Sequence, residues 1–153
     1  MTLSQRIVIV DDERSVRSGL SNLLHSDGYT TRLFESGEAL LADDNALSEV
    51  SMLIIDVGLK GMSGFELFTL LKQRPALPPV IFISADLEET TLWYAIALGA
   101  LTFFRKPIDV DAFLHLIRSE LSDDEGSRTS LTDGSLATAA GNNLAACSRR
   151  VGG

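Results

Sequence analysis

The stretch Ile7-Val8-Ile9-Val10-Asp11-Asp12 carries the pattern that decides the fold, a short apolar run that ends on acidic residues. Three later apolar runs end on polar residues in the same way: Met52–Ile55 on Asp56, Val80–Ile83 on Ser84, and Leu101–Phe104 just before Lys106-Pro107. Continuous apolar runs of this length are typical of parallel strands that are buried on both faces. Because ligands of open α/β sheets bind at the carboxyl ends of the strands, these polar side chains are predicted to converge.

The predicted crevice holds three carboxylates, one hydroxyl and one ammonium group. Carboxylate oxygens are the ligands that Mg²⁺ prefers, and a divalent cation together with a lysine is typical of sites that handle phosphoryl groups. The sequence therefore indicates Mg²⁺ and phosphoryl chemistry.

Size and charge narrow the class of protein. A chain of 153 residues, 45% hydrophobic and 22% charged, is long enough for one ordinary globular domain. Its net charge of −8 argues against binding to nucleic acid or anionic membranes, and favours basic or apolar protein partners. The amino terminus has no signal-peptide pattern and no apolar run reaches the roughly 20 residues of a membrane span, so a cytoplasmic location is expected.

Amphipathic stretches alternate with the apolar runs, which predicts a doubly wound α/β fold with a five-stranded parallel sheet and helices on both faces. A second strand is predicted at Tyr29–Phe34, in addition to the four runs above. Helices are predicted at about Glu13–His25, after Ser36, at Phe65–Lys72 after a cap at Ser63, at Glu88–Leu98, and from Asp109 or Asp111 to Leu121.

The composition changes after Leu121. Residues 122–153 are rich in Ser, Gly, Ala, Thr and Asn and poor in large apolar residues, so we expect a flexible or disordered tail without a second folded domain. The single cysteine, Cys147, lies in this tail, and we assign it no chemistry. The folded domain is accordingly predicted at residues 1–121.

Taken in order, these motifs resemble the receiver domain of two-component response regulators. The match is carried by Val8–Glu13, by Leu53–Asp56 with the glycine-rich Gly61–Gly64 behind it, by Ile83–Ala85, and by Gly99-Ala100 with Phe103–Pro107. It covers about Arg6 to Leu121, and the local sequence is most similar to receivers of the nitrogen-fixation type. The resemblance implies a flavodoxin-like fold of the receiver type and a phosphorylation-controlled switch.

The resemblance also implies a role for each site residue. Asp56 accepts the phosphoryl group, Asp12 and Asp56 bind Mg²⁺ directly together with the main-chain carbonyl of Gly58, and Asp11 acts through a bound water. Lys106 and Ser84 contact the phosphoryl oxygens. The family switches when the hydroxyl at Ser84 and the aromatic ring at Phe103 turn inward, and it has a cis bond at the position of Pro107.

Each residue also has a structural interpretation. The acids at 11–13 can simply favour a helix start, Asp56 can end a strand, Ser84 can serve a turn, and Lys106 can be surface charge. Phe103 is compatible with a position in the core as well as with a role in the switch. We interpret Glu13, His25 and His115 as residues on solvated helix faces.

The chain departs from the family pattern in the loop after Asp56. Lys60 stands where many receivers have proline, and Gly58 has no side chain at a position that influences dephosphorylation. Asp86, two residues after Ser84, remains a possible modulator of access. The lifetime of the phosphate is therefore not predicted from the sequence.

The helix at 88–98 carries the adjacent aromatic residues Trp93 and Tyr94. Neighbours on a helix cannot both face one core, so at least one of the two is expected at the surface. Exposed aromatic side chains mark contact sites, and this helix belongs to the output surface of the receiver family. We therefore interpret the pair as a partner surface.

The sequence is compatible with three classes of function. A switch would take its phosphoryl group from a sensor histidine kinase or a histidine phosphotransfer protein, and would act through its fourth helix, fifth strand and fifth helix on a protein target or a phosphorylation-dependent homodimer. A Mg²⁺-dependent phosphohydrolase would normally need a general acid and a lid, which Asp56-Val57-Gly58 does not offer. A binding module without phosphorylation would not need all five key residues. The first, a non-enzymatic regulator, is the prediction; whether it stands alone or precedes a DNA-binding domain stays open.

Overall fold

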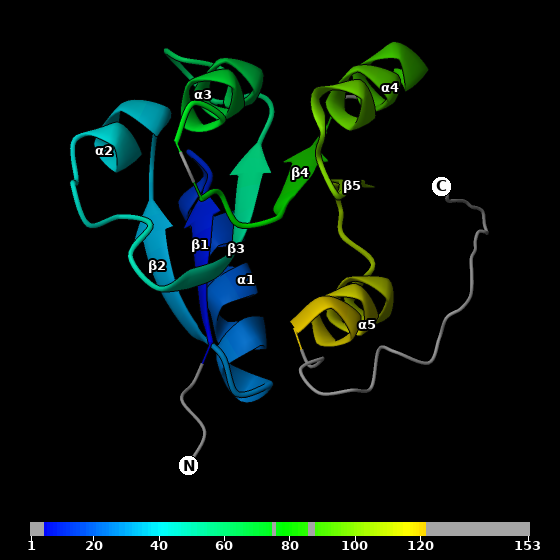
Figure 1. Ribbon diagram of the computed structural model, residues 1–153. Helices are drawn as coiled ribbons and strands as arrows, with labels where there is room; N and C mark the ends of the chain where they lie inside the picture. Colours follow the sequence, from blue (N-terminus) through cyan, green and yellow to red (C-terminus); the bar gives the residue numbers. More distant parts are fainter. Residues whose placement is uncertain (1–4, 75, 86–87, 122–153) are drawn as a thin grey trace. The chain divides into compact units, whose positions relative to one another are not determined.

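The computed structural model describes residues 5–74, 76–85 and 88–121, and the packing considered below lies within residues 5–113. Strands and helices alternate along the chain (Figure 1). Their bounds are β1 (Arg6–Val10), α1 (Arg14–Ser26), β2 (Thr30–Phe34), α2 (Gly37–Leu41), β3 (Val50–Asp56), α3 (Gly64–Leu71), β4 (Val80–Ser84), α4 (Glu89–Leu98), β5 (Thr102–Arg105) and α5 (Val110–Leu121).

The five strands form one sheet in the order β2-β1-β3-β4-β5, and every neighbouring pair is parallel. The apolar residues of β1 are fully buried on both faces of the sheet. Val8 and Val10 belong to a core with Leu40 of α2 and Leu67 of α3, while Leu20 and Leu24 are the buried apolar residues of α1. The predicted doubly wound parallel sheet is confirmed.

Three helices, α2, α3 and α5, begin where a short polar side chain accepts a main-chain hydrogen bond. Ser36 Oγ accepts from Ala39 N at 3.0 Å, and Ser63 Oγ accepts from Glu66 N at 3.1 Å in a capping box. Asp109, rather than Asp111, precedes α5 and accepts from Ala112 N at 3.1 Å. Gly99 ends α4 with a φ of 111°, a conformation that favours glycine.

Parallel pairing brings the carboxyl ends of the central strands to one edge of the sheet. Val10 pairs with Ile55, Asp56 with Ile83, and Ser84 with Arg105. The residues that follow β1 and β5, and those that end β3 and β4, therefore lie at the same edge. The predicted element bounds are confirmed to within one or two residues, and β3 starts two residues earlier than predicted, at Val50.

Some predictions fall outside the residues that the structure describes. They concern Asp86, Cys147 and the tail at 122–153. No helix in the described ranges is long and apolar enough to cross a membrane.

Candidate metal centre

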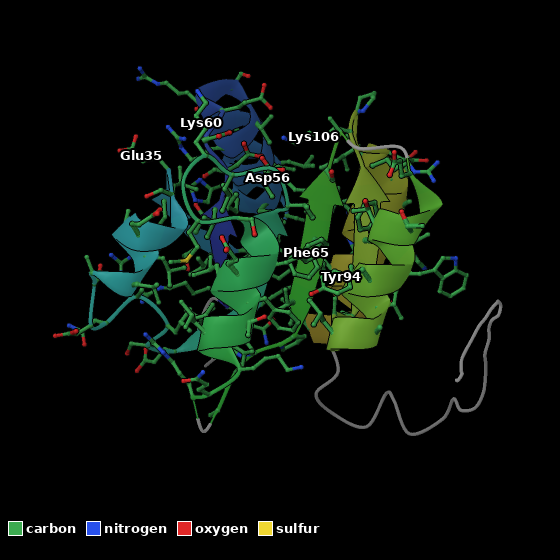
Figure 2. All side chains as sticks on the ribbon, turned by 90° about the horizontal axis from the view of Figure 1, so that it is seen from above. Glu35, Asp56, Lys60, Phe65, Tyr94 and Lys106 are labelled. Atoms are coloured by element: carbon green, nitrogen blue, oxygen red, sulfur yellow. The ribbon has the colours of Figure 1, made fainter. Side chains whose placement is uncertain are left out.

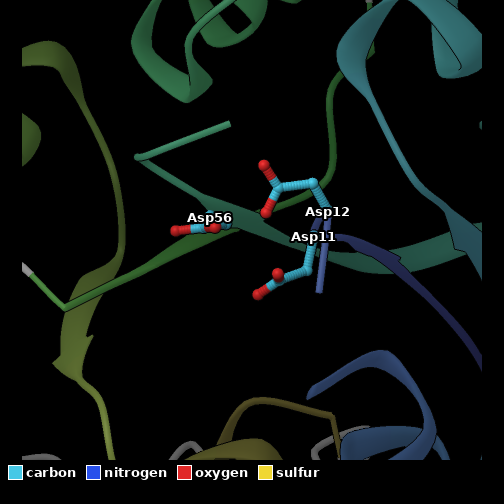
Figure 3. Close-up of side chains that lie close together, drawn as sticks. All are labelled: Asp11, Asp12 and Asp56. Carbon is cyan, nitrogen blue, oxygen red and sulfur yellow. The ribbon is translucent and has the colours of Figure 1, made fainter. Parts of the chain in front are cut away.

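Three carboxylates converge at the carboxyl edge of the sheet, as Figure 3 shows. Asp11 and Asp12 follow β1 and Asp56 ends β3, and one oxygen atom from each lies within 4.8 Å of the others. Asp11 and Asp56 are buried, whereas Asp12 is partly exposed. The predicted convergence of these three acids is therefore present in the fold.

Lys106, directly after β5, directs its ammonium group at this cluster (Figure 2). Its Nζ lies 3.0 Å from Asp11 Oδ2 and 3.4 Å from Asp56 Oδ2. Among the described residues, Asp11 Oδ2 has no hydrogen-bond partner, and the ammonium contacts it as an ion pair. Burial lowers the pKa of Lys106, but the contacts with Glu13 and Asp11 and the charge of Asp56 outweigh this effect and raise that pKa.

The pKa of Asp56 reflects its burial and the charges around it. Burial, followed by the nearby charge of Asp11, raises the pKa of Asp56, although hydrogen bonding from Gly58 N and the charge of Lys106 act in the opposite direction. One ammonium thus contacts two members, Asp11 and Asp56, of a cluster of three carboxylates. An oxygen-only donor set with excess negative charge and a buried oxygen without a hydrogen bond fits a hard divalent cation.

Ser84 and Phe103 lie on the two strands beside the acids. Ser84 ends β4 and is buried, and its carbonyl accepts from Lys106 N at 2.9 Å, which joins β4 to the lysine. Phe103 is partly buried against the core and pairs with Phe82 in the register of β4 and β5. The Lys106–Pro107 peptide bond is cis, as the resemblance implied.

The loop at 57–63 brings main-chain groups to the acids. Gly58 N donates to Asp56 Oδ1 at 3.1 Å, which places this residue beside the phosphoacceptor candidate. Lys60 N donates to Asp12 Oδ2 at 3.1 Å. The departure from proline at Lys60 therefore supplies an N–H donor that proline lacks. Sequence reasoning noted the substitution and missed this bond.

Glu13 corrects a prediction. The sequence predicts a residue on a solvated helix face, whereas Glu13 precedes α1 and its Oε1 lies 3.0 Å from Lys106 Nζ. Its side chain is 59% exposed, so it pairs with the lysine at the rim of the cluster. The signal was its position next to Asp12, in the same acidic run.

Both aromatic residues of α4 are exposed, Trp93 by 65% and Tyr94 by 52%. The expectation that at least one lies at the surface is therefore confirmed. Tyr94 packs edge-on against Phe65 of α3, with ring centroids 4.8 Å apart (Figure 2). The two rings border a mostly apolar groove of about 430 Å³, which Met62, Thr69 and Leu70 also line.

Comparison with known proteins matches this geometry to a family. The family model of the response regulator receiver domain matches residues 7–118. The chain belongs to this family. Phosphorylation and Mg²⁺ binding are features of receiver domains, and the acids at the ends of β1 and β3 are this chain's acidic cluster.

Individual relatives agree with the family. The chain is 35% identical to the C4-dicarboxylate transport transcriptional regulatory protein DctR of Rhodobacter capsulatus over 81% of its own length and 64% of that protein. It is 29% identical to the transcriptional regulatory protein FixJ of Bradyrhizobium diazoefficiens, over 82% of its own length and 60% of that protein. The chain thus spans less than two thirds of the length of these regulators.

A solved structure agrees with the fold. The CheY-like receiver domain protein of Methanospirillum hungatei superposes with a TM-score of 0.69 at 24% identity, over 78% of this chain and 95% of that one. The predicted receiver-type fold and the membership of the response regulator receiver family are confirmed.

Proposed function

We propose that this receiver accepts one phosphoryl group on Asp56 from a phosphohistidine donor and then changes its contacts with a protein partner. The observation that carries the proposal is the position of Asp56. It is a buried carboxylate at the end of the central strand, within 4.8 Å of two further carboxylates and 3.4 Å from an ammonium. The proposal takes residues 1–121 as the receiver domain and residues 122–153 as a tail.

Each site residue has its own role in the proposed phosphoryl transfer. A carboxylate oxygen of Asp56 forms a bond to phosphorus while the bond from phosphorus to the donor's imidazole nitrogen breaks, and the imidazole leaves with the electron pair. Asp12, Asp56 and the carbonyl of Gly58 would hold Mg²⁺, and Asp11 would act through water. A cation held there would offset the repulsion between the acids and the incoming phosphoryl group. Lys106 pairs with the phosphoryl oxygens, and the Ser84 hydroxyl donates to one of them.

A groove beside Lys106 supports docking of a helical donor. Its walls come from α1 and from the segment after β5, and it has a volume of about 330 Å³ with mostly apolar walls. Val16, Leu20 and Leu23 line it from α1, and Pro107 and Ile108 line it from the other side. Because the groove reaches Lys106, an apolar helix face of a histidine kinase or phosphotransfer protein seated there brings its phosphohistidine to Asp56.

The proposed output surface includes α4 and β5. Its support is the exposure of Trp93 and Tyr94, since two adjacent exposed aromatic side chains are typical of contact surfaces. Inward turning of Ser84 and Phe103 would connect it to the phosphoryl group. The target is a basic or apolar protein surface or a second copy of this chain, and neither nucleic acid nor membrane, because the chain is acidic.

Acetyl phosphate with MgCl₂ tests the proposal. We expect intact mass spectrometry to show a single phosphoryl adduct on the wild type, and no adduct with EDTA or in Asp56→Asn. An unmodified wild type would favour the binding module without phosphorylation. Rapid multiple turnover of small phosphate esters would favour the phosphohydrolase over a cytoplasmic, non-enzymatic switch.

A further inference from the structure

The loop at 57–63 is held by three carboxylates in a regular order. Alternate main-chain N–H groups along the loop each donate to one acid: Gly58 to Asp56 Oδ1 at 3.1 Å, Lys60 to Asp12 Oδ2 at 3.1 Å, and Met62 to Glu38 Oε2 at 2.9 Å. The first two acceptors belong to the acidic cluster itself. The third, Glu38, comes from α2 and contacts none of the cluster residues in any described bond.

The fit between Glu38 and the loop is close. Gly61 has a φ of 73°, and a Cβ atom on it would lie 2.8 Å from Glu38 Oε2 and 3.4 Å from Oε1. A side chain at this position would therefore displace the carboxylate as well as strain the backbone. On the other side of the same contact, a Cβ atom on Gly37 would lie 3.2 Å from the sulfur of Met62. The absence of side chains at Gly37 and Gly61 thus allows α2 and the loop at 57–63 to lie close together.

The first turn of α2, which carries Glu38, is held in place by a helix cap and by a buried side chain. Ser36 caps the helix through Ala39 N, and Leu40 of the same helix is fully buried. An acid in the first turn is favoured by the helix dipole, but that needs no contact with another segment. Glu38 is an exposed residue, yet its carboxylate is directed at one main-chain N–H of the loop.

We propose that Glu38 is a positioning residue for the metal site. By holding Met62 N it fixes the far end of the loop, and Asp56 holds the near end. The loop between these two points carries the Gly58 carbonyl and the Lys60 N–H that orients the Asp12 carboxylate. Groups that orient metal ligands typically change metal affinity by about 10- to 100-fold when they are removed. The inference rests on the proposed Mg²⁺ site.

The test is a titration of the unfolding temperature with MgCl₂, from which the apparent Mg²⁺ affinity is obtained. Glu38→Ala is expected to weaken Mg²⁺ binding about tenfold. Glu38→Gln keeps an acceptor at the same reach and is expected to stay close to wild type. Glu38→Asp keeps the charge and shortens the side chain, so it is expected to weaken binding as Ala does. It also serves as the second variant if Glu38→Ala fails to fold.

Glu35→Ala is the matched control, because it removes the same charge from an exposed residue three positions earlier (Figure 2). It is expected to leave Mg²⁺ affinity unchanged. Wild-type affinity in Glu38→Ala and Glu38→Asp would overturn the inference, even if both unfold at a lower temperature in EDTA. The inference would also be overturned if Glu38→Gln and Glu35→Ala weakened Mg²⁺ binding as much as Glu38→Ala does. The loss of one negative charge would then explain the effect. A wild type that binds no Mg²⁺ would instead overturn the proposed function.

Discussion

Glu13 Oε1 and Lys106 Nζ lie 3.0 Å apart, although 93 residues separate them in the sequence. The ion pair sits at the exposed rim of the acidic cluster, and it places a further negative charge beside the lysine that would contact a phosphoryl group. Glu13 therefore competes with the phosphoryl oxygens for the Lys106 ammonium. It also repels an anionic phosphodonor.

We predict that Glu13→Gln speeds phosphorylation by acetyl phosphate about two- to fivefold at low salt, which is the size expected for one charge at the edge of a hydrated site. The gain should shrink as ionic strength rises, because salt screens exposed charges. Glu13→Asp keeps the charge and serves as the control. Rates from intact mass spectrometry at low and high NaCl check the prediction, and a slower Glu13→Gln at both salts would contradict it.

The raised pKa of Asp56 predicts an effect on stability in the absence of metal. A carboxyl group whose pKa is raised by folding stabilises the fold below its ordinary value of 3.8, and this contribution is lost as pH rises through the folded-state pKa. At neutral pH the ionised Asp56 therefore disfavours the folded state. In EDTA, Asp56→Asn should be more stable to urea than wild type at pH 7, and the difference should narrow toward acid pH. A less stable Asp56→Asn at pH 7 would contradict this sign.

Asp43 predicts the opposite pH dependence. A side-chain hydrogen bond from Arg32, at 2.6 Å, is the main cause that lowers the pKa of Asp43 below 3.8. The contribution of this pair to stability is therefore present at pH values above 3.8 and is lost as pH falls through the folded-state pKa of Asp43. Asp43→Asn should lower the urea midpoint slightly at pH 7, and this effect should shrink as pH falls below 3.8. Asp44→Asn, at the neighbouring exposed acid, is the control for the loss of one negative charge.

At Gly64, close packing favours glycine whereas helix propensity favours alanine. It begins α3, where alanine is intrinsically better than glycine, but a Cβ atom there would overlap the Asp56 carbonyl oxygen and lie 2.9 Å from the Val57 Cα. We predict that Gly64→Ala destabilises the protein by about 1–3 kcal/mol, the usual range for overpacking against backbone. Gly19→Ala in α1, where no atom lies within 4 Å of the added Cβ, should stabilise it by about 0.4–1 kcal/mol. Urea unfolding of both variants checks the pair.

The sequence predicted the sheet and the acids well because both depend on strands. A buried parallel strand reads as an apolar run, and the residue that ends the run must lie at the carboxyl edge, as Asp56 and Ser84 do. The exposed aromatic side chains of α4 were predictable for a similar reason, since helical geometry forbids adjacent Trp93 and Tyr94 from sharing a core.

The contacts that the sequence did not reveal depend on the path of a loop or on the direction of a long side chain. Glu13 could turn to Lys106 or to solvent, and only the placement of β5 decides between the two. The bonds from Lys60 N to Asp12 and from Met62 N to Glu38 use main-chain donors, which every residue except proline carries and which therefore leave no pattern. The loss of proline at Lys60 was the one visible sign.

Phosphorylated Asp56 would be an acyl phosphate, and hydroxylamine tests for this group directly because this nucleophile displaces phosphate from an acyl phosphate to leave a hydroxamate. The protein would be treated with acetyl phosphate and MgCl₂, then with hydroxylamine, and its peptides mapped by tandem mass spectrometry. We predict a hydroxamate at Asp56 that is absent when EDTA replaces MgCl₂. A hydroxamate on a different acid, or none on a protein shown to be folded and to bind Mg²⁺, would contradict it.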